Sequence, residues 1–160
     1  MEVIIDLKHF QALVDNLFSY DDAGLVTRYQ DVKPETLNPL VLAYIGDAYF
    51  NLYMRGRLLA FEQNKVQILH SFGAKMVSAK YQAVAYKEIE AELTELEQAV
   101  FKRGRNAKCN VPKSATVQEY RCSTGFEALL GFLYLKKDFA RLTALVDKTF
   151  LITAQNLAKK

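Results

Sequence analysis

Two apolar segments that each carry a single acidic residue and a nearby glycine constrain the fold most. The first, LAYIGDAYFNLYMR, covers residues 42–55 and holds Asp47 directly after Gly46. The second, RCSTGFEALLGFLYL, covers residues 121–135 and holds Glu127 one helical turn before Gly131. Both read as helices by pattern. A glycine inside a helix costs about 1 kcal/mol relative to alanine, and close backbone approach of two crossing helices would compensate for that cost.

The two acids have no ion-pair partner on their own helices. Neither Lys nor Arg stands three or four positions from Asp47 or Glu127, the spacing at which helical side chains meet. A buried unpaired carboxylate is costly, so each acid needs a donor, a metal ion or a solvent-filled cleft. If the helices cross, the carboxylates meet, and a divalent cation such as Mg²⁺ would relieve their repulsion. The alternative is that Asp47 is exposed or bonded to a remote donor.

Periodicity elsewhere in the chain predicts an all-α protein. Asn38 and Pro39 are typical of a helix start, as N-cap and first helical residue. Asn64 is a candidate cap for a later helix, and Thr94 with Glu97 has the pattern of a capping box. No stretch alternates convincingly like a strand. The expected helices cover residues 3–18, 38–59, 65–72, 74–91, 94–104, 117–134 and 138–158.

Composition favours one soluble domain. The 160 residues are 51% hydrophobic and 24% charged, which is ordinary for a globular protein with a single core. No run of 18 apolar residues is present, and the N-terminus lacks a signal-peptide pattern, so we expect a cytoplasmic protein without a membrane span. Cys109 and Cys122 have no metal-ligand spacing and are expected to be free thiols in a reducing compartment.

Charge is unevenly distributed along the chain. Residues 88–97 contain five glutamates and no base, whereas residues 102–113, KRGRNAKCNVPK, contain five basic residues and no acid. A basic loop after an acidic helix is a candidate for phosphate contacts. The alternative is an ordinary solvated surface loop.

Several blocks resemble a known family. Ile45-Gly46-Asp47 in a leucine-rich helix, followed by FEALLG at residues 126–131, resembles the paired signatures of the ribonuclease III superfamily. LNPLVLAYIGDAYF, VSAKYQA, KRGRNAK and PKSATVQEYRCSTGFEALLGFLYL resemble the Mini-III branch in order and spacing, over residues 37–157. The resemblance implies the all-helical endonuclease fold of ribonuclease III, as a homodimer. Residues 37–160 would form the catalytic domain after a partly helical extension, residues 1–36, with no separate double-stranded-RNA-binding domain.

The resemblance also implies a function. It indicates an endoribonuclease that cuts double-stranded RNA with Mg²⁺, leaves 5′-phosphate and 3′-hydroxyl ends, and matures the large-subunit (23S) ribosomal RNA precursor. Asp47 and Glu127 would be the catalytic and metal-binding residues. Full-length ribonuclease III has further acids at the positions of Ala43 and Thr124, so waters and RNA phosphate oxygens would have to complete the metal shell here. A ribosomal protein that presents the substrate is a further expected partner; a membrane is not.

RNA contacts are expected from basic side chains, because A-form RNA is recognised through phosphates and 2′-hydroxyls. Arg121 could instead pair with Glu119. An alternative function is a non-catalytic RNA-binding or ribosome-associated module with the same fold, and a purely structural helical bundle is a third. The expected RNA-binding residues are Lys102, Arg103, Arg105, Asn106, Lys108 and Lys113, with Lys75, Lys80 and Arg121 as weaker candidates.

Overall fold

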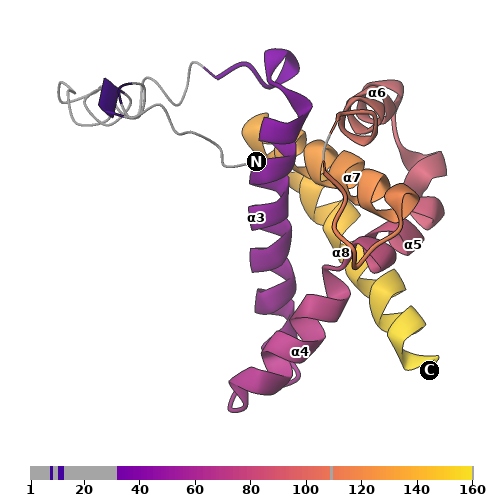
Figure 1. Cartoon of the computed structure of the whole chain (residues 1–160). Helices are drawn as coiled ribbons and strands as arrows, with labels where there is room; N and C mark the ends of the chain where they lie inside the picture. The colour runs from indigo at the N-terminus through magenta and orange to yellow at the C-terminus, as the bar shows by residue number, and fades with distance from the viewer. Residues whose placement is uncertain (1–7, 9–10, 13–31, 109, 160) are drawn as a thin grey trace. The chain divides into compact units, whose positions relative to one another are not determined.

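The computed structural model describes residue 8 and residues 11–12, 32–108 and 110–159. The chain falls into two compact units, Met1–Lys33 and Pro34–Lys160. The described residues of the second unit form helices, turns and loops without a strand (Figure 1), which confirms the all-α expectation. The helix expected over residues 3–18 lies outside the described residues, apart from three helical positions.

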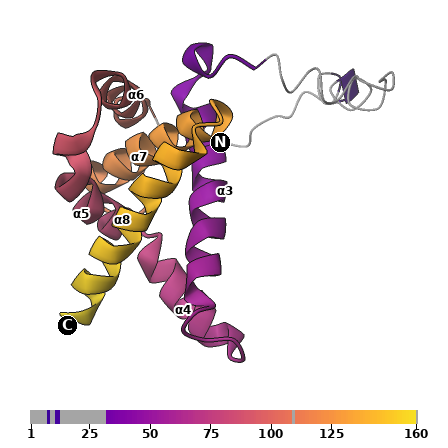
Figure 2. The same ribbon diagram turned by 180° about the vertical axis from the view of Figure 1, so that it is seen from behind.

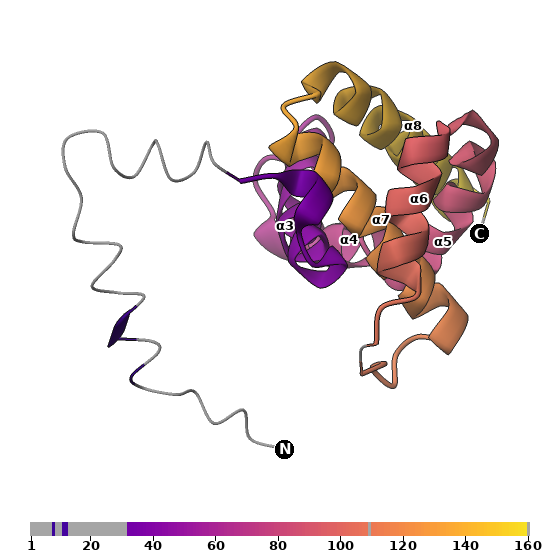
Figure 3. The ribbon, with the colours of Figure 1, turned by 90° about the horizontal axis from the view of Figure 1, so that it is seen from above.

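Helix α7 (Val117–Leu135) is the central element of the second unit. It contacts α3, α5, α6 and α8, and the view from above shows it between α3 and α6 (Figure 3). From behind, α8 crosses beside α5 and α7 (Figure 2). The other elements are η1 (Pro34–Thr36), α3 (Pro39–Leu58), α4 (Val66–Met76), α5 (Ala79–Ile89), η2 (Glu90–Glu92), α6 (Glu95–Arg105) and α8 (Phe139–Ala158).

Side-chain caps fix the starts of four helices, one of them α8, where the Asp138 side chain accepts a hydrogen bond from Arg141 N at 3.2 Å. The Asn38 side chain accepts a hydrogen bond from Leu40 N at 2.9 Å, so the expected start of α3 is confirmed. The Thr94–Glu97 capping box at α6 is also confirmed. A second capping box, Thr116 with Glu119, starts α7 and was not expected from the sequence.

The expected boundary between the two helices of residues 64–91 is wrong. Helix α4 does not end near residue 72 but continues to Met76, and the break before α5 lies at Val77 and Ser78. Lys65, rather than Asn64, is the N-cap of α4, and its side chain makes no capping bond. Gly73, which lies between the two expected helices, is buried inside α4, where a Cβ atom would make an ordinary contact with Leu58 at 3.7 Å. Packing of α4 against α3 therefore prevails over the low helix propensity of glycine.

The core lies around the buried faces of α7. Phe126, Leu129 and Leu130 are fully buried, and the Phe126 ring meets Phe50 of α3 edge to face with centroids 5.6 Å apart. Helix α7 is thus anchored on both sides of Glu127. Among the described residues, no helix is long and apolar enough to cross a membrane.

Candidate functional site

Helices α3 and α7 approach each other backbone to backbone at two glycines. A Cβ atom added to Gly131 would lie 1.9 Å from the carbonyl oxygen of Leu42 and 3.0 Å from the backbone nitrogen of Gly46. Neither neighbouring group can move without moving its helix, because both are backbone atoms. The close crossing that the two glycine-containing segments predict is therefore present.

This crossing brings Asp47 and Glu127 to one cleft of about 510 Å³. The two acids, 80 positions apart in sequence, reach the cleft from α3 and α7. The remaining walls come from the start of α5 and from the segment that precedes α7. The lining residues are Asp47, Val77, Ser78, Ala79, Lys80, Gln82, Pro112, Ser114, Ala115, Tyr120, Ser123 and Glu127.

Glu127 is the more enclosed acid. Its Oε1 accepts a hydrogen bond of 2.8 Å from Nε2 of Gln82 on α5. Burial raises the pKa of the Glu127 carboxyl to about 7; the Gln82 hydrogen bond opposes the rise and the negative charge of Asp47 adds to it. The negative charge of Asp47 is therefore close enough to act on the Glu127 carboxyl.

Asp47 is the solvent-accessible acid of the cleft. Nδ2 of Asn51, one helical turn further along α3, donates to Asp47 Oδ1 at 2.8 Å and to the Asp47 carbonyl oxygen at 2.9 Å. The alternative that Asp47 is exposed to solvent is therefore correct. Its side chain is nevertheless oriented by Asn51 and lines the same cleft as Glu127, where a ligand in the cleft can contact it.

Two positions beside these acids contribute no carboxylate. Ala43 is buried in α3, and the Thr124 hydroxyl donates to the Tyr120 carbonyl oxygen at 3.0 Å. Within the described residues, no group of three His, Cys, Asp or Glu side chains could hold a metal ion. The pair Asp47 and Glu127 nevertheless fits Mg²⁺, which takes one or two carboxylates and keeps several waters. A cation there would also offset the negative charge of Asp47, which adds to the rise that burial causes in the pKa of Glu127.

Six of the residues expected to contact RNA lie at two places, the end of α6 and the segment that joins α6 to α7. Three basic residues and Asn106 are exposed at the C-terminal end of α6, and two lysines lie in the segment that joins α6 to α7. That segment also supplies Pro112, Ser114 and Ala115 to the cleft wall, so Lys113 stands between lining residues. Lys80 lines the cleft itself. The end of α6 carries Lys102, Arg103, Arg105 and Asn106, and the joining segment carries Lys108 and Lys113.

Three of the expected contact residues, Arg103, Arg121 and Lys75, differ from the rest in their surroundings. Arg103 donates to the carbonyl oxygens of Glu35 at 3.2 Å and Leu37 at 2.7 Å, so it ties α6 to the chain that leads into α3. Arg121 is exposed on α7, and Glu119, its suggested partner, is engaged in the Thr116 capping box instead. Lys75 lies 6.0 Å above the Phe72 ring on α4 and does not line the cleft.

Gln82 is the site residue that sequence reasoning missed. It is 1% exposed and contacts Glu127 directly. Its signal in the sequence is a lone amide among the alanines and tyrosines of AKYQAVAY, at a position where a helix buried on this face would carry an apolar residue. Because glutamine is common on helix surfaces, this signal cannot be recognised until the buried face is known.

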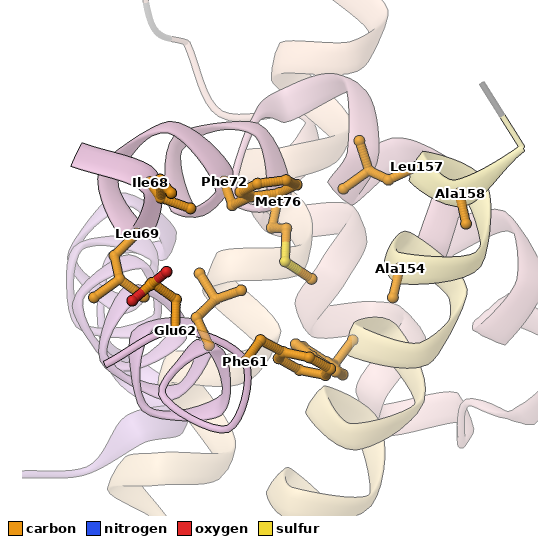
Figure 4. A pocket seen from close by; sticks show the side chains of 11 residues that line it. Phe61, Glu62, Ile68, Leu69, Phe72, Met76, Ala154, Leu157 and Ala158 are labelled. Carbon is orange, nitrogen blue, oxygen red and sulfur yellow. The ribbon is translucent and has the colours of Figure 1, made fainter. Parts of the chain in front are cut away.

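A second cavity, of about 400 Å³, is apolar and lies away from the acids. Figure 4 shows Phe72 and Met76 of α4 facing Ala154 and Leu157 of α8 across it. Glu62 is its single charged lining residue, so it lacks groups for phosphodiester chemistry. His70, exposed on α4, lies outside the cleft as well.

Comparison with known proteins decides the family. The model of the ribonuclease III domain family matches residues 40–138, a range that contains both cleft acids. The chain belongs to the ribonuclease III family. The resemblance to its Mini-III branch is also confirmed, because several curated Mini-ribonuclease 3 proteins are close relatives. Members of the ribonuclease III family are endoribonucleases and generally depend on divalent metal ions, so the activity class is cleavage of RNA.

Two Mini-ribonuclease 3 proteins and one crystal structure illustrate the similarity. A Mini-ribonuclease 3 from Thermoanaerobacter sp. (strain X514) is 48% identical over 113 residues, which are 70% of this chain and 80% of the relative. One from Staphylococcus aureus (strain NCTC 8325 / PS 47) is 43% identical over 126 residues, 77% of this chain and 94% of the relative. The crystal structure of protein FN1578 from Fusobacterium nucleatum superposes with a TM-score of 0.65 at 35% identity, covering 70% of this chain and 90% of that one.

Proposed function

We propose that this protein is a magnesium-dependent endoribonuclease that cleaves double-stranded RNA and leaves 5′-phosphate and 3′-hydroxyl ends. The observation that carries the proposal is the convergence of Asp47 and Glu127 on one open cleft that Lys80 also lines. The substrate we propose is the large-subunit (23S) ribosomal RNA precursor in the cytoplasm, presented with or without a ribosomal protein. Residues 37–160 act as the catalytic domain and residues 1–36 as an extension.

Asp47 and Glu127 would hold the magnesium ion. When bound, magnesium activates water for attack and neutralises the charge that develops on the phosphate. Asp47, exposed and oriented by Asn51, is accessible to the ion from solvent. Glu127 holds one carboxylate oxygen against Gln82 and contributes its charge from the partly buried wall. With two acids in place of four, metal binding without RNA should be weak, because RNA phosphate oxygens complete the shell.

The basic residues would hold the RNA backbone over the cleft. Lys80 lines the cleft, Lys113 stands between two lining residues, and the last turn of α6 adds Lys102, Arg103 and Arg105. Contacts of this kind neutralise phosphates without reading sequence. They therefore suit an enzyme whose substrate is recognised as a duplex.

A homodimer would give the two cuts that a duplex requires. Helix α3 exposes Tyr44 at 76% and Leu52 at 72%, with Leu40 and Val41 partly exposed nearby. Large apolar side chains in a row on one helix face are typical of a protein interface. A two-fold axis along this face would relate two clefts as it relates the two strands of RNA.

The proposal is tested by cleavage of long double-stranded RNA with native protein and with Asp47→Asn, each in magnesium and in chelator. We expect cutting only by the native protein and only with magnesium. Glu88→Gln, at an exposed acid of α5, is the matched control and should cut normally. Cutting by Asp47→Asn at the native rate would remove Asp47 from its role.

The absence of carboxylates at Ala43 and Thr124 favours one second candidate, a non-catalytic RNA-binding or ribosome-associated module. The same experiment separates the two functions. RNA bound by the folded native protein without cutting, on both naked duplex and ribosomal precursor particles, would support the binding module and overturn the nuclease.

A further inference from the structure

Gln82 is a polar side chain at a buried position of α5, where an apolar side chain would normally be found. It is 1% exposed, and its Nε2 donates two hydrogen bonds, to the Val77 carbonyl oxygen at 3.0 Å and to Glu127 Oε1 at 2.8 Å. Its own oxygen, Oε1, is buried without a hydrogen-bond partner among the described residues. An unpaired buried acceptor is costly, and a methionine of similar length would avoid that cost. The two hydrogen bonds that Nε2 donates must therefore be the reason that this buried position holds a glutamine.

The orientation of the Gln82 amide follows from its neighbours. Val77 presents a carbonyl oxygen and Glu127 a carboxylate oxygen to the same terminal atom, and both are acceptors. Only the NH₂ group can satisfy them, because a flipped amide would place oxygen against two oxygens. Gln82 thus connects Glu127 to the junction between α4 and α5, which Val77 forms.

A second glutamine, Gln98, shows which of the two Gln82 hydrogen bonds is common to helix starts in this chain and which is particular to Gln82. Gln98 on α6 donates from Nε2 to the Leu93 carbonyl oxygen at 3.2 Å, five residues back, as Gln82 does to Val77. Gln98 contacts no carboxylate in the described structure. The bond to a preceding carbonyl is therefore a local feature of a helix start that recurs in this chain, and the bond to Glu127 is particular to Gln82.

We propose that Gln82 is a positioning residue for Glu127. By holding Oε1 of the Glu127 carboxylate against α5, it fixes the direction in which the second oxygen faces the cleft. Partners of metal-binding side chains act in this way and typically change metal affinity by about 10- to 100-fold when removed. The proposal rests on the metal-binding role of Glu127 proposed above.

The test measures Mn²⁺ binding to RNA-free protein by the loss of the free-ion paramagnetic resonance signal. Gln82→Met should weaken Mn²⁺ binding about 10-fold or more, and Gln98→Met should leave it unchanged. Glu127→Gln should abolish most binding. If Glu127→Gln binds Mn²⁺ like the native protein, the metal site itself is wrong. If Glu127→Gln loses binding while Gln82→Met keeps it, the metal site stands and the role of Gln82 is overturned.

A measurement on the native protein guards against a variant that fails to fold. The side-chain amide signals of Gln82 and Gln98 can be followed by nuclear magnetic resonance during a Mg²⁺ titration. We expect the Gln82 signal to shift with the midpoint of metal binding and the Gln98 signal to stay in place. A Gln82 signal that does not move while the ion binds would overturn the proposal.

Discussion

A Cβ atom at Gly46 would lie 1.8 Å from the carbonyl oxygen of Glu127. The glycine that precedes one acid of the cleft is therefore in contact with the backbone of the other acid. Any side chain at position 46 would push α7 away from α3, and Glu127 away from Asp47. The spacing of the two carboxylates depends on this residue as much as on the acids themselves.

Gly46→Ala should lower both stability and metal affinity. The clash is with backbone, which cannot rotate aside, so we expect a loss of about 1–3 kcal/mol in the free energy of unfolding, or more. Gly56→Ala, on the same helix with no atom within 4 Å of an added Cβ, is the matched control. It should raise stability by about 0.5–1 kcal/mol. Equal effects of the two substitutions in chemical denaturation would contradict the close crossing.

Metal-free protein should lose stability as the pH rises from about 4.5 to about 7. Burial raises the pKa of Glu127 from 4.5 to about 7, so in this range the folded state binds more protons than the unfolded chain. Stability from this group is thus greatest below pH 4.5 and declines up to pH 7. Thermal unfolding in chelator checks this, and Glu127→Gln should remove the decline. Mg²⁺ should raise the melting temperature more at pH 8 than at pH 6.

Arg141 should matter more for stability than other ion-pairing residues. It donates to both carboxylate oxygens of the buried Glu97, at 2.8 and 2.9 Å, and joins α8 to α6. Arg141→Met would leave that carboxylate with Thr94 as its remaining partner, so we expect a loss of about 1.5–3 kcal/mol. Lys148→Met, which breaks an exposed pair with Glu92, should cost less than about 1 kcal/mol in the same denaturation assay.

Two neighbouring arginines should differ in what they support. Arg105→Ala should weaken RNA binding and reduce the salt dependence of the affinity by about one unit, because one phosphate contact is lost. Arg103 bonds two carbonyl oxygens, so Arg103→Ala should also lower stability, by about 1 kcal/mol. Binding isotherms at several salt concentrations, paired with unfolding curves, measure both effects. An unchanged salt slope in Arg105→Ala would remove that residue from the RNA surface.

Tyr44→Glu should convert the proposed dimer into monomers. A charge at the most exposed apolar position of α3 would be buried without a partner in a two-fold contact. Leu96→Glu, at an exposed leucine of α6, should leave the oligomeric state unchanged. Sedimentation equilibrium gives the masses, and a native protein that is monomeric at all concentrations would refute the dimer.

The paired glycines and acids made the central crossing predictable, because each glycine stands near the single acid of an apolar helix, where close backbone approach offsets its low helix propensity. The helix starts at Asn38 and Thr94 were equally predictable, because the capping side chains are recognisable in the sequence. The α4–α5 break was not, since Gly73 is compatible with a turn or with the buried face of a helix, and tertiary contacts choose between them. The contact of Gln82 with Glu127 could not be predicted, for a related reason. It depends on the burial of Gln82, and a single sequence does not show which face of a helix is buried.

The cleft joins residues from opposite ends of the second unit, and this has a consequence for biosynthesis. Helix α3 is made early, but Glu127 and the surface against which α3 packs are added some 80 residues later. Chains grow from the N-terminus at roughly 5–20 residues per second. A nascent chain therefore carries Asp47 for several seconds with no partner acid, and the complete site cannot assemble until α7 has left the exit tunnel of the ribosome.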